Sequence, residues 1–103
     1  MTPVSIHEQV YDLVRQIPAG KVSTYGRIGV ILSMNPRYVG YILHNNPYEG
    51  EVPCHRVVNS RGGVAATFAF GGGGEQQKLL ENEGVIFIRG KVDNSCIIDM
   101  LID

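Results

Sequence analysis

The sequence has no tryptophan, few cysteines and no long run of apolar residues. A membrane-spanning helix needs roughly 20 consecutive apolar residues, and the longest apolar runs here, 28–32 and 85–88, are far shorter. Residues 1–5 also lack the basic group and the apolar stretch of an export signal. These absences predict a protein with no membrane span that resides in the cytoplasm, or in the nucleus if its source is eukaryotic.

The scarcity of cysteine also limits covalent and metal cross-links. Cys54 and Cys96 are the two cysteines, and a cytosolic chain of this size needs no disulfide. A structural zinc site requires four Cys or His ligands at characteristic spacings, which Cys54, the adjacent His55 and the distant Cys96 do not supply. We therefore expect no structural metal.

The chain has little net charge, but the charge is unevenly distributed. Its 103 residues are enough for one domain, taken as 1–103, and the net charge is -1. Residues 1–61 contain six basic and four acidic side chains, whereas residues 62–103 contain three basic and six acidic ones. This asymmetry suggests that the first part faces a polyanion, although ordinary solvated charge explains it equally well.

The first half of the chain has the pattern of three short helices. Ser5 is followed by Glu three residues later and by apolar residues at helical spacing, which predicts a capped helix over 6–17. Ser23 is a good cap for a second helix over about 24–32, and Asn35 with Pro36 begins a third that ends near residue 45. The second and third helices, joined by three residues, form a helix-turn-helix candidate.

The second half predicts a small β element and one further helix. Residues 57–58 are extended and lead to a turn at 59–63, and the glycine-rich stretch 64–74 is expected to form a mobile loop. A fourth helix over 75–82 ends at Gly84, and a small hairpin follows over 85–92. The predicted fold class is mostly α with a small β element.

The third predicted helix has one apolar and one polar face. Its exposed face carries an arginine, a glycine and ring-bearing residues at helical spacing: Arg37, Gly40, Tyr41 and His44. A glycine lets a helix backbone approach a narrow DNA minor groove closely. The alternative is a surface helix with an incidental glycine.

The run Val52-Pro53-Cys54-His55-Arg56-Val57-Val58 carries the candidate chemistry. A free thiol with a pKa near 8.5 needs a base or nearby positive charge to act as a nucleophile, and His55 and Arg56 could supply both. Adjacent side chains on an extended segment point in opposite directions, so His55 would reach the sulfur through a bridging water or a bent backbone. Taken alone, a buried structural cysteine is the more common outcome.

The same run resembles the active-site signature of the O6-alkylguanine-DNA alkyltransferases. The surrounding order matches as well: Ser23-x-Tyr25, Arg37-x-x-Gly40, Asn46-Pro47, Pro53 to Val57, and Leu79-Leu80-x-x-Glu83-Gly84. The resemblance covers about residues 5–88 and corresponds to the family's C-terminal DNA-binding domain. It implies a winged-helix-like helix-turn-helix domain that carries the active-site cysteine.

The resemblance implies binding to double-stranded DNA that contains O6-alkylguanine. The helix-turn-helix would enter the minor groove, Arg37 would enter the duplex in place of the extruded base, and Tyr25 would push on the phosphate or contact the flipped guanine. The implied DNA-binding residues are Ser23, Thr24, Tyr25, Arg37, Tyr38, Gly40 and Tyr41.

It also implies a division of catalytic roles. Cys54 would be the nucleophile at the bottom of an open cavity, with His55 as its base through water and Glu83 orienting His55. Asn46 would join the recognition helix to the active-site segment, and the carbonyls of Cys54 and Val57 would accept from the guanine amino group. Transfer would consume the protein, which is expected to act as a monomer without a cofactor.

The sequence departs from the family pattern after the cysteine. Active members carry a Tyr-Ser-Gly-Gly-like stretch followed by a lysine, whereas this chain has Phe-Ala-Phe-Gly-Gly at 68–72 and Gln76 near the lysine position. The chain also resembles alkyltransferase-like proteins, which bind damaged guanine and recruit excision repair, and in which tryptophan or alanine usually replaces the cysteine. Because Cys54 is present, we prefer the transferase to this damage sensor, and both to a plain helix-turn-helix regulator, which leaves the run around Cys54 unexplained.

Overall fold

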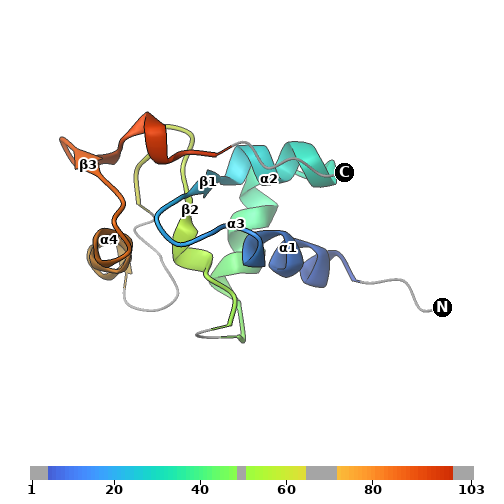
Figure 1. Cartoon of the computed structure of the whole chain (residues 1–103). Helices are drawn as coiled ribbons and strands as arrows, with labels where there is room; N and C mark the ends of the chain where they lie inside the picture. The colour runs from blue at the N-terminus through green and yellow to red at the C-terminus, as the bar shows by residue number, and fades with distance from the viewer. Residues whose placement is uncertain (1–4, 49–50, 65–71, 99–103) are drawn as a thin grey trace.

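A computed structural model of the chain describes residues 5–48, 51–64 and 72–98. This part is mostly α-helical with two small two-stranded sheets, as the sequence predicts (Figure 1). In chain order, the elements are α1 (Ile6–Arg15), β1 (Ser23–Thr24), α2 (Tyr25–Leu32), α3 (Pro36–His44), the 3₁₀ turn η1 (Cys54–Arg56), β2 (Val57–Val58), α4 (Gly72–Asn82), β3 (Phe87–Ile88), β4 (Lys91–Val92) and the 3₁₀ turn η2 (Asn94–Cys96). Within the described residues, no helix has the length and apolar character needed to cross a membrane.

Side-chain caps fix the starts of the first three helices. The Ser5 side chain accepts a hydrogen bond from the Glu8 amide at 3.2 Å, and Asn35 accepts from the Arg37 amide at 2.9 Å, as expected. The cap of α2 is Thr24, which accepts from the Arg27 amide at 3.1 Å, so the prediction that Ser23 caps this helix is wrong.

The position of Ser23 is decided by tertiary pairing rather than by local preference. Ser23 lies in β1, where it pairs in parallel register with Val57 while Thr24 pairs with Val58. Ser23 is fully buried. Both residues are good caps, and the pairing of β1 with β2 leaves the capping position to Thr24.

Helices α2 and α3 form the predicted helix-turn-helix. The turn begins at Ser33, which is in the left-handed region with φ of 55°, and the Met34 amide returns to donate to the Gly29 carbonyl at 2.8 Å. A Cβ atom at Gly29 would lie 2.6 Å from the Met34 carbonyl oxygen, so only glycine fits. The angle between the two helices therefore depends on this glycine.

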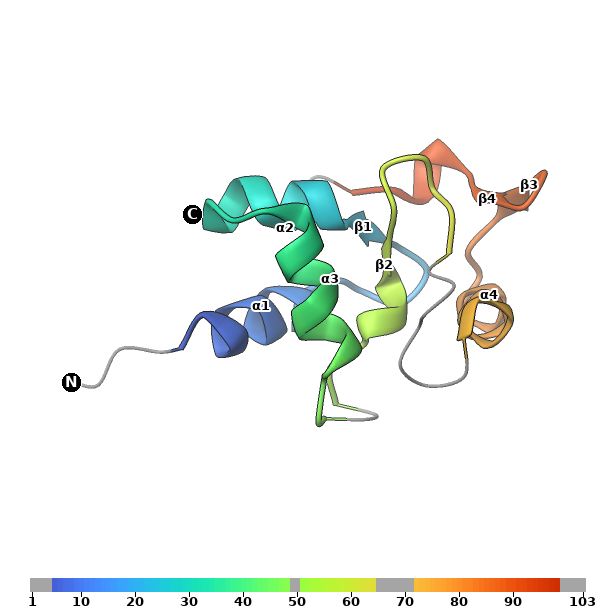
Figure 2. The ribbon, with the colours of Figure 1, turned by 180° about the vertical axis from the view of Figure 1, so that it is seen from behind.

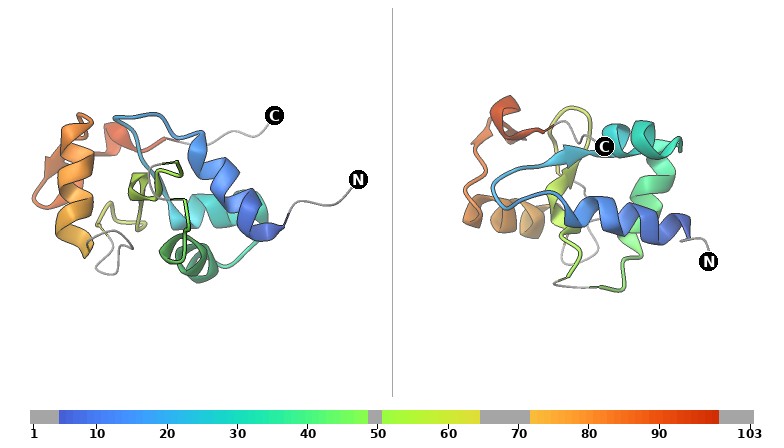
Figure 3. Two further views of the ribbon diagram at one scale, coloured as in Figure 1. Left: turned by 90° about the horizontal axis from the view of Figure 1, so that it is seen from below. Right: turned by 45° about the vertical axis from the view of Figure 1, so that its right-hand side comes forward.

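The strand pair β1–β2 lies between two apolar clusters. The larger cluster contains buried side chains of α1, α2 and α3 together with Cys54 and Val57, and the smaller one contains Val58, Leu80 of α4 and residues of the C-terminal segment. Figures 2 and 3 show α1, α2 and α3 on one side of the strands and α4 on the other. The segment with the candidate nucleophile thus runs through the middle of the molecule.

The C-terminal half follows its prediction with shifted bounds. Helix α4 starts at Gly72, three residues earlier than expected, and Gly84 follows it with a φ of +92°. The hairpin is confirmed, with β3 and β4 paired antiparallel around Arg89 and Gly90, both at positive φ. Most of the predicted loop, residues 65–71, and the last five residues lie outside the described part of the chain.

Candidate active site

The candidate nucleophile lies in a 3₁₀ turn and not on an extended segment. The Cys54 amide donates to the Val52 carbonyl at 2.8 Å and the Arg56 amide to the Pro53 carbonyl at 2.9 Å. The Val57 amide then donates to the Cys54 carbonyl. The backbone is therefore bent at Cys54, and the argument that adjacent side chains of an extended segment point in opposite directions does not apply to Cys54 and His55.

The expectation of an open sulfur is not met. Cys54 is 5% exposed and belongs to the larger apolar cluster, against which the partly buried Tyr25 and Tyr48 pack. A cavity of about 350 Å³ lies nearby on the helix-turn-helix side, lined by Tyr25, Gly26, Pro36, Arg37, Gly40, Asn59 and Ser60. Among the described residues, Cys54 does not line it.

Tyr25 lies between this cavity and the sulfur. Its ring lines the cavity and packs against the cluster that contains Cys54. Burial raises the pKa of Tyr25 to about 12, and the negative charge of a Cys54 thiolate adds to this shift. The Tyr25 hydroxyl is therefore protonated at neutral pH and can donate a hydrogen bond.

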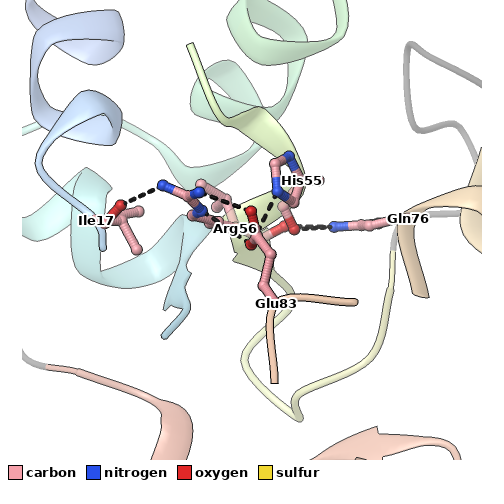
Figure 4. Close-up of polar contacts among 6 residues, drawn as sticks. Ile17, His55, Arg56, Gln76 and Glu83 are labelled. Atoms are coloured by element: carbon pink, nitrogen blue, oxygen red, sulfur yellow. Dashed lines mark hydrogen bonds and ion pairs between the residues drawn. The ribbon is translucent and has the colours of Figure 1, made fainter. Parts of the chain in front are cut away.

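Glu83 contacts the two side chains that follow the cysteine (Figure 4). Its Oε1 lies 3.0 Å from His55 Nε2, and its carboxylate accepts from Arg56 Nε at 3.0 Å and Nη2 at 2.6 Å. Arg56 Nη1 donates to the Ile17 carbonyl at 2.8 Å. The guanidinium of Arg56 thus binds the Glu83 carboxylate and the backbone just after α1.

The carboxyl group of Glu83 is held in its charged form. Burial alone would raise its pKa, but hydrogen bonds from Arg56 and His55, together with their charges, lower the pKa below its ordinary value of 4.5. At neutral pH the His55 ring therefore faces a carboxylate. Such a partner orients an imidazole and stabilises its protonated form.

Gln76 holds the same turn through its backbone. This side chain is fully buried on α4, and its amide Nε2 donates to the carbonyls of His55 at 3.0 Å and Val57 at 2.9 Å. No site role was predicted for Gln76. No local pattern marks it, because its partners lie 21 and 19 residues away, and Glu83, which also holds the turn, lies just after the end of α4.

Asn46 connects the end of α3 to the segment before the cysteine. It is buried, its Nδ2 donates to the Val52 carbonyl at 3.3 Å, and its Oδ1 accepts from the Tyr48 amide at 2.8 Å. Because the Cys54 amide donates to the same Val52 carbonyl, Asn46 is one carbonyl away from the nucleophile's own backbone.

The candidate DNA-binding residues fall into two groups. Arg37 is exposed, and Tyr38 and Tyr41 are exposed with their rings stacked at 6.0 Å between centroids. By contrast, Ser23 is fully buried and Thr24 is 5% exposed. Ser23 and Thr24 therefore shape the start of α2 and present almost no side-chain surface to a ligand.

Gly40 differs from the glycine of the helix-turn-helix bend. A Cβ atom at Gly40 would meet only the Tyr25 ring at 3.9 Å, an ordinary contact. Internal packing therefore does not require glycine here, which is consistent with close approach of an external ligand to α3. No group of three or more His, Cys, Asp or Glu side chains that could hold a metal ion occurs among the described residues.

Comparison with known proteins agrees with this arrangement. Residues 5–85 match the family model described as 6-O-methylguanine DNA methyltransferase, DNA binding domain. The chain belongs to this family. Alkyltransferase-like protein 1 of Schizosaccharomyces pombe is 43% identical over 81 residues, covering 77% of this chain and 75% of that protein.

Other members of the alkyltransferase family differ in how much of their length is matched. A methylated-DNA–protein-cysteine methyltransferase of Sulfolobus acidocaldarius is 40% identical over 82 residues, which cover 79% of this chain and 50% of the relative. A solved structure of the S. pombe alkyltransferase-like protein, in complex with damaged DNA containing O6-carboxymethylguanine, has a TM-score of 0.74 and 38% identity, covering 90% of this chain and 91% of that one. This chain thus spans half the length of the Sulfolobus methyltransferase.

Proposed function

We propose that this domain binds double-stranded DNA containing O6-alkylguanine and accepts the alkyl group on Cys54. The observation that carries the proposal is the turn Cys54–Arg56, in which the residue after the cysteine has its imidazole 3.0 Å from the Glu83 carboxylate. A buried structural cysteine needs no such partner beside it. A sulfur nucleophile needs a base that a third group orients.

The proposed DNA-binding surface is the exposed side of α3 together with the adjoining cavity. Arg37 is exposed and can enter the duplex, Gly40 permits close approach to the minor groove, and Tyr38 and Tyr41 flank them. Tyr25, with its protonated hydroxyl, lies where the cavity meets the cluster around Cys54. In this proposal Tyr25 helps to move the alkylated guanine out of the base stack and towards the sulfur.

The transfer step needs no cofactor. The thiol proton passes from Cys54 to His55 through a water molecule, and the imidazolium is stabilised by Glu83. The sulfur attacks the alkyl carbon, an S–C bond forms, and the bond from that carbon to guanine O6 breaks. The electron pair remains on the guanine, which takes up the proton, so the products are a thioether and unmodified guanine.

A damage sensor that binds O6-alkylguanine without transfer is the alternative. Two observations favour it: Cys54 is 5% exposed, and the match to the alkyltransferase-like protein bound to damaged DNA extends over 91% of that chain. In this alternative the complex would recruit excision-repair proteins. Both functions use the same DNA-binding surface.

Mass spectrometry of the intact protein separates the two functions. The protein is incubated with a duplex that contains O6-methylguanine and then weighed. The proposal expects a mass gain of one methyl group that is lost in Cys54→Ala. Cys96→Ala is the matched control, because Cys96 is also a buried free cysteine, and this variant should retain the mass gain. Binding without a mass gain would reject transfer and support the sensor, and absence of binding would reject both.

A further inference from the structure

Gln76 is a buried polar residue that the proposed reaction does not use. It has no exposed surface, and its single amide nitrogen donates to two carbonyls, those of His55 and Val57. A buried amide that lost these partners would be costly. Both hydrogens of the amide group are directed at the backbone that follows Cys54.

We propose that Gln76 is a positioning residue that sets the base specificity of the site by fixing the Val57 carbonyl. The inference rests on the proposed function, because it concerns how an everted guanine is read. The Watson–Crick edge of guanine carries O6, N1 and the 2-amino group. When the alkyl carbon on O6 faces the sulfur, the amino group faces the backbone beside the cysteine.

The acceptors for that amino group are the carbonyls of the turn. A carbonyl oxygen has two lone pairs, and at Val57 one accepts from Gln76 at 2.9 Å. Because Val57 is fully buried, the base must displace part of the cluster around Cys54 to reach the other. The Cys54 carbonyl is coupled to this geometry because it accepts from the Val57 amide. With Gln76 in place, the direction of the free lone pair on Val57 is set before the base arrives.

The other side chains that contact the turn do not hold the Val57 carbonyl. Glu83 holds the side chains of His55 and Arg56, and Asn46 holds the Val52 carbonyl before the turn. The side chain that donates to the Val57 carbonyl comes instead from α4. Loss of Gln76 should therefore affect recognition of the 2-amino group more than the environment of the His55 ring.

The test compares two damaged bases that differ only in the amino group. Binding to duplexes with O6-methylguanine or O6-methylhypoxanthine is measured in a Cys54→Ala background, so that no alkyl transfer occurs. The parent should prefer O6-methylguanine by about tenfold, the effect of one hydrogen bond. Gln76→Met, which keeps the length and removes both donors, should reduce this preference to about threefold or less.

Matched variants exclude a general structural effect. Gln77→Met changes the neighbouring, half-buried glutamine and should keep the tenfold preference. If Gln76→Met does not fold, Gln76→Asn is used, since its amide is one methylene shorter and cannot hold both carbonyls in the same place. A folded variant at residue 76 that keeps the parent's preference overturns the inference.

The proposed function and this inference can fail separately. If the parent binds O6-methylguanine and unmodified duplexes equally, the proposed function fails, and the inference fails with it. If the parent selects O6-methylguanine but does not distinguish it from O6-methylhypoxanthine, the role assigned to the Val57 carbonyl is wrong while the proposed function stands.

Discussion

Replacing Glu83 with glutamine would remove a carboxylate that two neighbouring side chains share. Glutamine keeps the length and one acceptor oxygen, but it cannot pair with both donors of Arg56 or offer a negative charge to His55. The Arg56 side chain is 18% exposed and that of Glu83 is 20% exposed. The variant would therefore leave a largely buried cation that keeps the Ile17 carbonyl and at most one acceptor oxygen at residue 83.

The cost can be estimated from this burial. Removing one partner of a fully buried ion pair costs roughly 3–5 kcal/mol, and partial exposure together with the remaining acceptor reduces this to about 2–3 kcal/mol. For a domain of this size each kcal/mol lowers the melting temperature by roughly 4–8 °C. We expect Glu83→Gln to melt about 10–20 °C below the parent at pH 7.

The difference should depend on pH in a defined direction. The pKa of Glu83 in the folded protein is lowered from 4.5, so its contribution to the free energy of unfolding is fully present above the unfolded value. That contribution is lost as the pH falls through the folded pKa. The gap between parent and Glu83→Gln should be constant above about pH 5.5 and should narrow below pH 4.5.

Thermal unfolding followed by circular dichroism across this pH range tests the reasoning. Glu81→Gln is the matched control, because Glu81 is exposed in α4 two residues before Glu83, and its change should stay within about 0.5 kcal/mol. If Glu83→Gln melts with the control at pH 7, or if the gap does not change with pH, the ion pair does not stabilise the turn.

Three further predictions concern other parts of the site. In urea titrations, Gly29→Ala should lower the free energy of unfolding by more than about 2 kcal/mol because of the 2.6 Å clash. Gly40→Ala should leave that free energy unchanged or raise it, and it should weaken binding to a damaged duplex. Equal stability of the two variants would contradict the assigned geometry. Asn46→Ala should cost about 1–3 kcal/mol because the Tyr48 amide loses its acceptor and the Val52 carbonyl loses one of its two donors, against a smaller loss for the exposed Asn45→Ala. In a spectrophotometric titration, the ionisation near pH 12 should be present in the parent and absent from Tyr25→Phe. If Tyr25→Phe instead lacks an ionisation at lower pH, the Tyr25 hydroxyl is not buried.

Local signals predicted the helical half of the molecule well. The caps at Ser5 and Asn35, with Pro36 after it, act within one helical turn and so can be recognised from neighbouring residues. Ser23 and Thr24 are both suitable caps, and the choice between them depends on pairing with a strand more than 30 residues away. Local preference could not resolve that choice.

The candidate site was predictable in composition but not in shape. The resemblance identified Cys54, His55 and Glu83, and the structure brings the last two within 3.0 Å. The sequence left a bent backbone at Cys54 as one of two alternatives, because the valines near Cys54 favour an extended segment, and the exposed sulfur that the resemblance implies is buried in the structure. The role of Gln76 depends on contacts across 19 and 21 residues, which no local pattern encodes.

The placement of β2 has a consequence for the way this domain opens. Val57 belongs to one apolar cluster and Val58 to the other, so neither half of the molecule can separate from its partner without releasing this strand. The turn that carries the sulfur is continuous with β2 and should exchange its amide hydrogens only when the whole domain unfolds. If the domain transfers the alkyl group as proposed, its reacting groups would keep their relative positions throughout the search along DNA.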